Sequence, residues 1–508
     1  MKRTSKLISR LMATRSEHQE PVIYPDQLPE DGHLSEQWFF DLFEGCADVR
    51  IFRHQILGGS AADSVILIYC DGMSDVMQIN QFVIPRLRHL PMSYVSELES
   101  TIELELQAIH EIDQIITKVF AGQLVIYFTR LHKLYAYDAA KIPDRQPEEA
   151  NTELSIKGPR DGFVENLAIN AALVRKRLRT NALRYEQYVI GRKSETRAAL
   201  LYIHGYIRPE VLNEARKRLR NIHVDSLLSS AQLEEIMSDS SLSLFPLITY
   251  TGRPDFVVEC LIRGRLAILV DGSPIAMIAP VNLTLLIKTP EDFYFPTHIV
   301  VFQMCIRLIG LWIALFLPGF WIALTSYNVE QLPFPLLATV VNTRLGLPMP
   351  GPVEAFLMLA LFEIFREAAI RLPKPVGQTI AVVGGIIVGD AVIRAGLAST
   401  TMLIVAALTA VATFTLVNQT LGASVTIVRT IVNSAAAFLG MYGYILSIVF
   451  IIIYLIRLES FGIPYLAPLS PLRPRYLIAA LFKEKMTSSN KRIGFLYDSG
   501  QADPGDQP

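Results

Sequence analysis

The run Ser434–Ile456 constrains the fold of this chain more than any other stretch, because its 23 residues include no charged side chain. A helix of this length can cross the hydrocarbon core of a bilayer, which is about 30 Å thick. Apolar stretches also occupy Leu308–Thr325, Met402–Asn418 and, apart from Asp390, Thr379–Ile393. The sequence therefore predicts a membrane region that follows a soluble N-terminal region.

Length and composition argue against several classes of protein. The 508 residues are too many for one ordinary domain, and 51% of them are hydrophobic. A formal net charge of −1 provides no basic field for nucleic acid. The four cysteines lie far apart and form no CxxC or Cys/His cluster, which argues against a metal site or a disulfide framework. The basic N-terminus lacks the apolar segment of a secretory signal, so the soluble region is expected in the cytoplasm.

The soluble region alternates between short apolar runs and helical patterns. Its composition and periodicity predict strands at Val49–Ile56, Ser64–Cys70, Leu124–Phe128 and Ala198–Ile203, and a strand pair at Phe256–Ile262 and Arg265–Val270. They predict helices at Ser35–Phe43, Ser93–Phe120 and Pro209–Ile222. Residues 65–72 (VILIYCDG) parallel residues 200–205 (LLYIHG), and 121–128 (AGQLVIYF) parallel 263–270 (RGRLAILV). We interpret these parallels as a repeat, with chance similarity of two generic strand–turn patterns as the alternative.

The expected fold is an α+β cytoplasmic region of two tandem α/β subdomains, followed by an α-helical polytopic membrane domain. The predicted parts are a flexible tail (1–34), a first α/β subdomain (35–150), a connecting helix region (151–185), a second α/β subdomain (186–295), a transmembrane domain (296–457) and a cytoplasmic C-terminal tail (458–508). The connecting helix ends in basic residues. They form either a solvated end or a docking surface for a partner subunit or anionic headgroups.

Charge predicts the topology. The C-terminal region is rich in lysine and arginine, and such segments stay on the cytoplasmic side. Two cytoplasmic ends require an even number of crossings. Four full spans meet this requirement if Val353–Phe365, a 13-residue segment that includes Glu354 and Glu363, is an incomplete or re-entrant helix. Arg307 is expected to snorkel, Thr409 and Thr413 to pack between helices, and Arg429 to mark an interface.

The charged part of the membrane region predicts a supporting or gating element. Helical spacing pairs Glu363 with Arg366 and Glu367 with Arg371, which lowers the cost of charge near lipid. Pro373 and Pro375 then end the helix. A broken helix at membrane depth is tolerated only where protein or water covers its backbone.

The segment after this break is the predicted pore wall or packing helix. The candidate residues are Gly384, Gly385, Val388, Gly389, Asp390 and Arg394. Gly385 and Gly389 form a GxxxG pair, which permits close helix contact. If subunits form a ring, Asp390 contributes to a ring of carboxylates that favours cations. The alternative is a packed helix with an internal pair between Asp390 and Arg394.

Four motifs resemble the GerA family of spore germination proteins, which contains the A-type subunits of nutrient germinant receptors. They are YCDGMSD (69–75), KGPRDGFVENLAINAALVRKRLR (157–179), FREAAIRLPKPVGQTIAVVGGIIVGDAVIRAG (365–396) and LESFGIPYLAPLSP (458–471). They follow in family order over about residues 35 to 475. One departure is Gly389-Asp390-Ala391, where the family triplet has glutamine at the central position.

This resemblance implies a location, partners and a role. The expected location is the inner membrane of a bacterial spore, with both ends on the cytoplasmic (core) side. The expected partners are a transporter-like B subunit, a C-type lipoprotein, membrane lipid and further copies of the chain. The implied role is an oligomeric nutrient-gated cation channel. The alternatives are a non-conducting receptor or scaffold subunit and a SpoVAF-type amplifier of ion release.

We expect no enzyme and no cofactor. The chain has no GxxxxGK[ST] phosphate loop and no HExxH arrangement, and its serines lack a credible base-and-orienter pattern. The glycine-rich VVGGIIVG (382–389) lies in a membrane segment rather than between a strand and a soluble helix.

Overall fold

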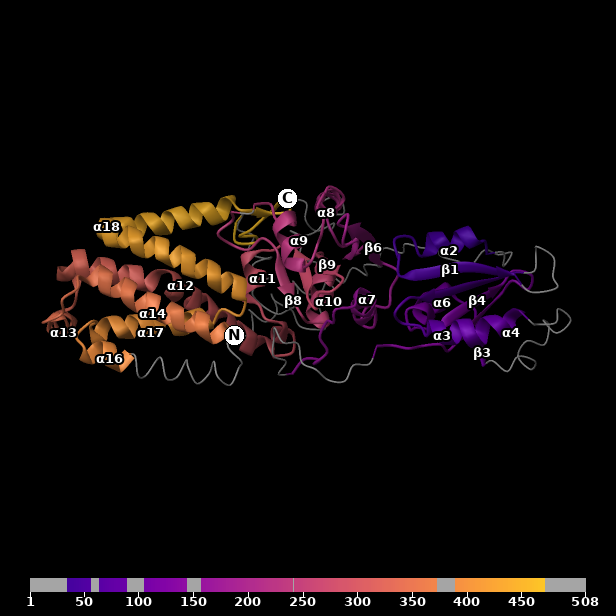
Figure 1. Ribbon diagram of the computed structural model, residues 1–508, viewed down its shortest axis with the longest axis horizontal. Coiled ribbons are helices and arrows are strands. Elements are labelled where there is room, and N and C mark those ends of the chain that lie inside the picture. Colours follow the sequence, from indigo (N-terminus) through magenta and orange to yellow (C-terminus); the bar gives the residue numbers. More distant parts are fainter. Residues whose placement is uncertain are drawn as a thin grey trace, which may run out of the picture. The chain divides into compact units, whose positions relative to one another are not determined.

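The computed structural model describes residues 34–55, 64–88, 105–143, 157–240, 242–371 and 389–470. The chain forms two compact units (Figure 1). The first unit comprises Met1–Gln146, Val164–Tyr188 and Arg197–Tyr206. The second comprises Pro147–Phe163, Val189–Thr196 and Ile207–Pro508.

A five-stranded sheet organises the first unit. Its strands are β1 (Val49–Gln55), β2 (Ser64–Cys70), β3 (Leu106–Ile109), β4 (Leu124–Phe128) and β5 (Lys133–Tyr137). They lie in the order β1-β2-β4-β5-β3, and every neighbouring pair is antiparallel. The predicted strands at β1, β2 and β4 are confirmed. Strand β2 reads as a continuous apolar run because both faces of the sheet are covered.

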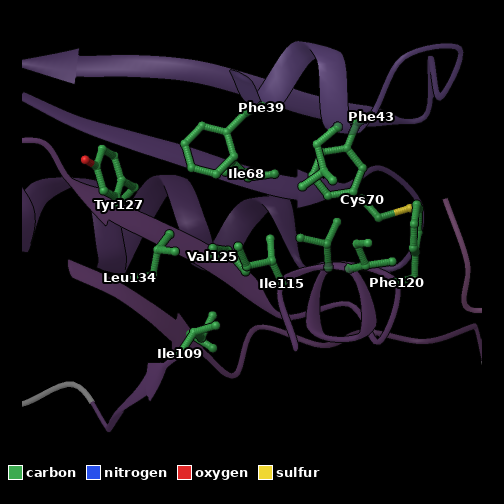
Figure 2. Packing of buried hydrophobic residues seen from close by; sticks show 14 of the residues in the cluster. Phe39, Phe43, Ile68, Cys70, Ile109, Ile115, Phe120, Val125, Tyr127 and Leu134 are labelled. Carbon is green, nitrogen blue, oxygen red and sulfur yellow. The ribbon is translucent and has the colours of Figure 1, made fainter. Parts of the chain in front are cut away.

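Helices cover both faces of this sheet. The helices are α2 (Glu36–Leu42), α3 (Val76–Gln78), the π-helix η1 (Ile79–Val83), α4 (Ile84–Arg88) and α6 (Ile112–Val119). Ile66 and Ile68 point to one face, where Phe39 of α2 and Ile115 of α6 pack (Figure 2). Val65 and Leu67 alternate to the other face, against Ile79 and Val83 of η1. The period of two along β2 thus separates two cores.

The later strands repeat this plan. They are β6 (Leu183–Ile190), β7 (Thr196–Ile203), β8 (Thr249–Thr251), β9 (Leu266–Val270) and β10 (Ala276–Ala279). Strand β6 neighbours β7 as β1 neighbours β2, and β9-β10-β8 repeats the order β4-β5-β3. The helices of this part are α7 (Leu167–Arg175), α8 (Pro209–Arg220), α9 (Ser230–Met237) and α10 (Pro254–Ile262). The similar stretches found in the sequence are therefore equivalent strands, β2 with β7 and β4 with β9.

Two secondary-structure predictions in this region were wrong. The predicted strand at Phe256–Ile262 belongs to helix α10, which begins with Pro254 at its first position. The predicted helix Ser93–Phe120 contains strand β3 and only the eight-residue helix α6. Residues 89–104 lie outside the described part.

The C-terminal half is mostly helical. Its elements are α11 (Leu283–Ile287), the 3-10 helices η3 (Pro290–Phe293) and η4 (Val329–Gln331), α12 (Thr297–Tyr327), α13 (Phe334–Arg344), α14 (Gly351–Arg371), α16 (Gly389–Arg394), α17 (Thr400–Phe414), α18 (Gln419–Arg457), and the short strands β11 (Glu459–Ser460) and β12 (Ile463–Pro464). Among the described residues, α12 and α18 are long and apolar enough to cross a membrane. Helix α17 is apolar but has 15 residues.

Helix α18 is interrupted at Gly440, where φ is +59° and ψ is −140°. A Cβ on Gly443 would lie 2.9 Å from the carbonyl carbon of Ala435. In a straight helix, residues eight apart are separated by about 12 Å along the axis. The chain therefore reverses here, and α18 is a hairpin of two helices (Figure 1). The predicted span Ser434–Ile456 is apolar, as expected, but it is not one straight helix.

Helix α14 is longer than the predicted segment Val353–Phe365. It runs for 21 residues, and such a helix is about 31 Å long. The predicted length of 13 residues is therefore wrong, and it was the reason for predicting an incomplete crossing. A core shared by several helices surrounds α14, and it contains Ala323 of α12, Met358 of α14, Ala406 of α17 and Ala436 of α18.

Candidate functional site: the junction of sheet and membrane helices

Arg253 is the centre of a buried charge network in the second unit. Its side chain is 1% exposed and donates to both oxygens of Asp255, at 3.1 and 2.7 Å. It also donates to Glu291 Oε1 at 2.5 Å. These carboxylates hold the pKa of Arg253 above its ordinary value against the effect of burial, which lowers it. The network joins the start of α10 to η3, which directly precedes α12.

The KGPRDGF segment (157–163) docks on this network. The amide of Lys157 donates to Glu291 Oε2 at 2.9 Å, and Phe163 N donates to Gly252 O at 2.9 Å. A Cβ on Gly158 would lie 2.8 Å from the ring of Tyr294 and would overlap Arg253. Only glycine permits this close approach.

Arg307 connects helix α12 to the same region. Its guanidinium binds both oxygens of Asp292, at 2.7 and 3.0 Å, and donates to Ile287 O at 3.1 Å. Asp292 also accepts bonds from the amide and hydroxyl of Thr289. The side chain of Arg307, which was expected to snorkel, is 13% exposed and ends on Asp292.

We expect Arg307→Gln to loosen α11 and η3 without unfolding the chain. The substitution removes a charge-assisted pair worth about 1.5–3 kcal/mol. Hydrogen exchange of residues 283–293 should accelerate accordingly. The control Arg457→Gln changes an exposed arginine at the end of α18 and should leave this exchange unchanged. Equal hydrogen exchange of residues 283–293 in Arg307→Gln and in the wild type would show that the Arg307–Asp292 pair does not hold α11 and η3 in place.

The segment after α18 returns to the strands. Ser460 Oγ donates to Leu247 O at 2.7 Å and accepts from Val281 N at 3.0 Å. Asn282, the N-cap of α11, donates to Ala467 O at 2.9 Å. The β8–β10 region of the second unit is therefore bonded both to the start of α12 and to the chain that leaves α18.

A buried carboxylate, Glu354, connects four helices of the C-terminal half. Glu354 is 1% exposed, and its Oε1 accepts bonds from the amide (2.6 Å) and the hydroxyl of Ser399, the N-cap of α17. Its Oε2 lies 3.8 Å from Arg344 Nη2 at the end of α13. Arg344 in turn donates to Thr325 O of α12 at 3.2 Å.

A second charge cluster lies further along α14. Glu363 accepts from Arg366 Nε at 2.9 Å, which confirms the predicted pair. It also accepts from Arg429 of α18 at 3.4 Å, and Arg429 donates to Thr413 of α17 at 3.1 Å. Arg429 is 5% exposed. The expectation that it marks an interface was therefore wrong, because the side chain joins three helices inside the bundle.

The other predicted site residues are only partly described. Gly384, Gly385, Val388, Pro373 and Pro375 lie outside the described residues. Gly389 and Asp390 begin α16 and Arg394 ends it, whereas Arg371 ends α14. The side chains of Asp390 and Arg371 are outside the description, so the pairs Asp390–Arg394 and Glu367–Arg371 stay predictions. Thr409 donates to Val405 O at 2.7 Å, as expected for helix packing.

Sequence reasoning missed the long-range partners of the junction. Arg253, Glu291 and Asp292 were not singled out, although the acidic pair Glu291-Asp292 lies shortly before α12, which contains the first apolar span. An acidic pair so close to an apolar helix was the sequence signal that could have predicted a charged junction. Among the described residues, no group of three or more His, Cys, Asp or Glu side chains could hold a metal ion.

The first unit contains its own buried ion pair, between Arg175 and Asp48. Arg175 Nε and Nη2 donate to the two oxygens of Asp48 at 2.7 and 2.9 Å. Arg175 also lies 4.1 Å from the centre of the Phe120 ring. Gly72 packs closely on the carbonyl of Ala168 in α7. The first basic residue of the connecting helix is therefore structural, and the motifs at 69–75 and 157–179 meet here.

Comparison with known proteins identifies the family of this chain. A family described as Bacillus/Clostridium GerA spore germination protein matches residues 37–495. The chain belongs to this family.

Individual relatives cover most of the chain. It is 39% identical to spore germination protein XA of Bacillus anthracis over 461 residues, which cover 89% of this chain and 93% of that protein. It is 33% identical to spore germination protein B1 of Bacillus subtilis (strain 168), over 81% of this chain and 86% of that protein. A solved structure, the N-terminal domain of the A subunit of the Bacillus megaterium spore germinant receptor GerK3, is 26% identical. It covers 48% of this chain and 92% of that chain, with a TM-score of 0.36.

Proposed function

We propose that this chain is the A-type subunit of a spore germinant receptor and forms or contributes to an oligomeric nutrient-gated cation channel. The family and the relatives named above support a role in germination. The observation that carries the proposed mechanism is the buried charge on α14. A charged side chain at the centre of a membrane helix costs about 2.5–3.5 kcal/mol on insertion scales. Glu363 lies near the middle of α14 and Glu354 in its first turn, and charged groups within membrane segments mark ion pathways.

The junction network supports a gating role for the soluble region. Arg253, Asp292 and Arg307 join the strands to α12, while Ser460 and Asn282 join them to the end of α18. A displacement of strands β8–β10 is therefore transmitted to the first and last described membrane helices. The nutrient signal itself is proposed to come from a transporter-like B subunit, with a C-type lipoprotein as the third partner. No catalysis is needed.

We place the chain in the inner membrane of the spore as a multi-pass protein with both ends on the core side. Three points of the helical region contact the mixed α/β part of the same unit. They are Arg307 through Asp292, Asn418 through Thr249 Oγ1 (2.9 Å) and Tyr454 through Leu244 N (3.0 Å). These three points must lie on one side of the bilayer, so an even number of crossings separates each from the next. This parity supports the charge-based topology.

The Asp390 carboxylate provides the test of conduction. Asp390→Asn removes a negative charge from the proposed pore ring, so we expect altered cation flux through the reconstituted oligomer and slower germination, with unchanged membrane insertion. Asp390→Glu keeps the charge and should retain cation preference. The matched control Glu459→Gln changes an exposed carboxylate outside the membrane helices. Wild-type ion release from stably expressed Asp390→Asn would count against the pore role.

A non-conducting scaffold that couples a nutrient sensor to a separate channel is the second candidate. It is favoured by the pairing of Glu363, Arg366 and Arg429 within one chain. Such internal pairing suits a packed bundle. Absence of ion flux through the purified, reconstituted wild-type oligomer would favour this candidate. A SpoVAF-type amplifier would instead conduct ions without needing the nutrient signal.

A further inference from the structure

Six charged side chains gather where the strands meet the first membrane helix, and we call them the junction cation cluster. Its members are Glu259, Arg263, Arg265, Lys288, Asp292 and Arg307. Arg263 is paired with Glu259 at 2.6 Å, and Arg307 is paired with Asp292 at 2.7 Å. Both acidic groups are therefore already used.

Among the described residues, two cations of the cluster form no ion pair with an acid, although Glu259 acts on both electrostatically and Asp292 on Lys288. Arg265 is 3% exposed and donates to neutral oxygens, Pro280 O at 3.2 Å and Asn282 Oδ1 at 3.1 Å. Lys288 is partly exposed, and within the described residues its ammonium group has no hydrogen-bond or ion-pair partner. A cation beside a buried one is costly unless it loses its proton or an anion binds to the more accessible of the two.

The pKa values of Lys288 and Arg265 are lowered, as expected for cations that form no ion pair. Burial, together with the neighbouring charges of Arg263 and Arg265, lowers the pKa of Lys288 to about 7. Burial lowers the pKa of Arg265 to about 10, so its guanidinium is still charged at neutral pH. A bound anion would offset the positive charge and favour the protonated form of Lys288.

The cluster lies at the surface of the predicted bilayer. Ile287, the residue before Lys288, accepts a hydrogen bond from Arg307 at 3.1 Å. Arg307 in turn directly precedes the apolar run Leu308–Thr325 of α12. Lys288 is therefore level with the point where α12 enters the hydrocarbon core. Lipid headgroups supply phosphate at this depth.

We propose that the junction cation cluster binds the phosphate of an anionic phospholipid, with Lys288 as the contacting group and Arg265 as a fixed positive charge behind it. The phosphate pairs with the cations whose acidic neighbours, Glu259 and Asp292, are already paired with Arg263 and Arg307. A lipid source is favoured over free phosphate because the headgroup is already held at this level by the membrane.

The test uses the full-length protein purified in nanodiscs of phosphatidylcholine and titrated with fluorescent phosphatidylglycerol. Lys288→Gln should weaken phosphatidylglycerol binding by about fivefold, which corresponds to about 1 kcal/mol for one basic residue at an anionic surface. Lys288→Arg should retain binding. The control Lys193→Gln changes a lysine whose side chain is 80% exposed and should also retain it.

A second measurement needs no substitution. The Lys288 amine should react with an amine-specific reagent at neutral pH in phosphatidylcholine discs and be protected in discs that contain phosphatidylglycerol. Equal labelling in both discs would overturn the proposal, as would unchanged lipid binding by Lys288→Gln. Displacement of phosphatidylglycerol by millimolar inorganic phosphate would overturn the lipid assignment and identify a free-phosphate site.

Discussion

Arg253→Leu is expected to destabilise the second unit by about 3–5 kcal/mol, the usual cost of removing one partner from a buried ion pair. The substitution leaves Asp255 and Glu291 buried side by side without their shared cation. Hydrogen exchange of residues 249–262 in the full-length protein should accelerate by the corresponding factor. Arg220→Leu, which changes an exposed arginine at the end of α8, should stay within about 0.5 kcal/mol of wild type.

A compensating variant separates charge from packing. If the unpaired carboxylates cause the loss, adding Asp255→Asn and Glu291→Gln to Arg253→Leu should restore part of the stability. No recovery would attribute the loss to packing around Gly158 and Tyr294 instead. Wild-type exchange in Arg253→Leu itself would contradict a structural role for the network.

The ion pair of the first unit should be equally sensitive. Asp48→Asn leaves the Arg175 guanidinium buried without a counter-charge, and we expect a loss of about 3–5 kcal/mol. The Phe120 ring lies 4.1 Å from the guanidinium, and a cation–π contact offsets about 0.5–2 kcal/mol of such a cost. The loss should therefore fall in the lower part of the range. Exchange of the β2 and β4 amides measures it.

The matched control for this pair is Asp41→Asn on α2. Asp41 is exposed and accepts one side-chain bond, from Gln37 at 3.0 Å. Its replacement should change stability by less than about 0.5 kcal/mol. Equal effects of Asp48→Asn and Asp41→Asn would show that the buried pair contributes no more than a surface carboxylate.

The elements that the sequence predicts well are those whose environment is uniform. Strands β2 and β4 are covered on both faces, so nearly all of their positions are apolar, and their observed bounds match the predicted ones. The run in α10 is equally apolar but helical. In so short a run the pattern does not distinguish a buried strand from a buried helix. The signal that decides is Pro254, which favours the first turn of a helix.

Whether an ion pair of the candidate site could be predicted depends on how far apart its two residues lie in the sequence. Glu363 and Arg366 are three residues apart, so helical spacing alone brings them together. The partners of the other buried charges are 38 residues apart for Arg253 and Glu291, 66 for Arg429 and Glu363, and 127 for Arg175 and Asp48. These pairs depend on how the strands and helices pack, which no local pattern encodes. Because its partner Glu363 is distant in the sequence, Arg429 was predicted to mark an interface rather than to lie inside the bundle.

The reversal at Gly440 limits how helix α18 can move. Both ends of the α18 hairpin are bonded to β8 or to the loop that precedes it, through Asn418 on Thr249 and through Tyr454 on Leu244. A helix held at one end can slide like a piston along the bilayer normal. A hairpin held at both ends cannot slide without breaking one of these bonds. Helix α18 must therefore tilt as a lever, with its pivot at the sheet and its largest displacement at the Gly440 turn.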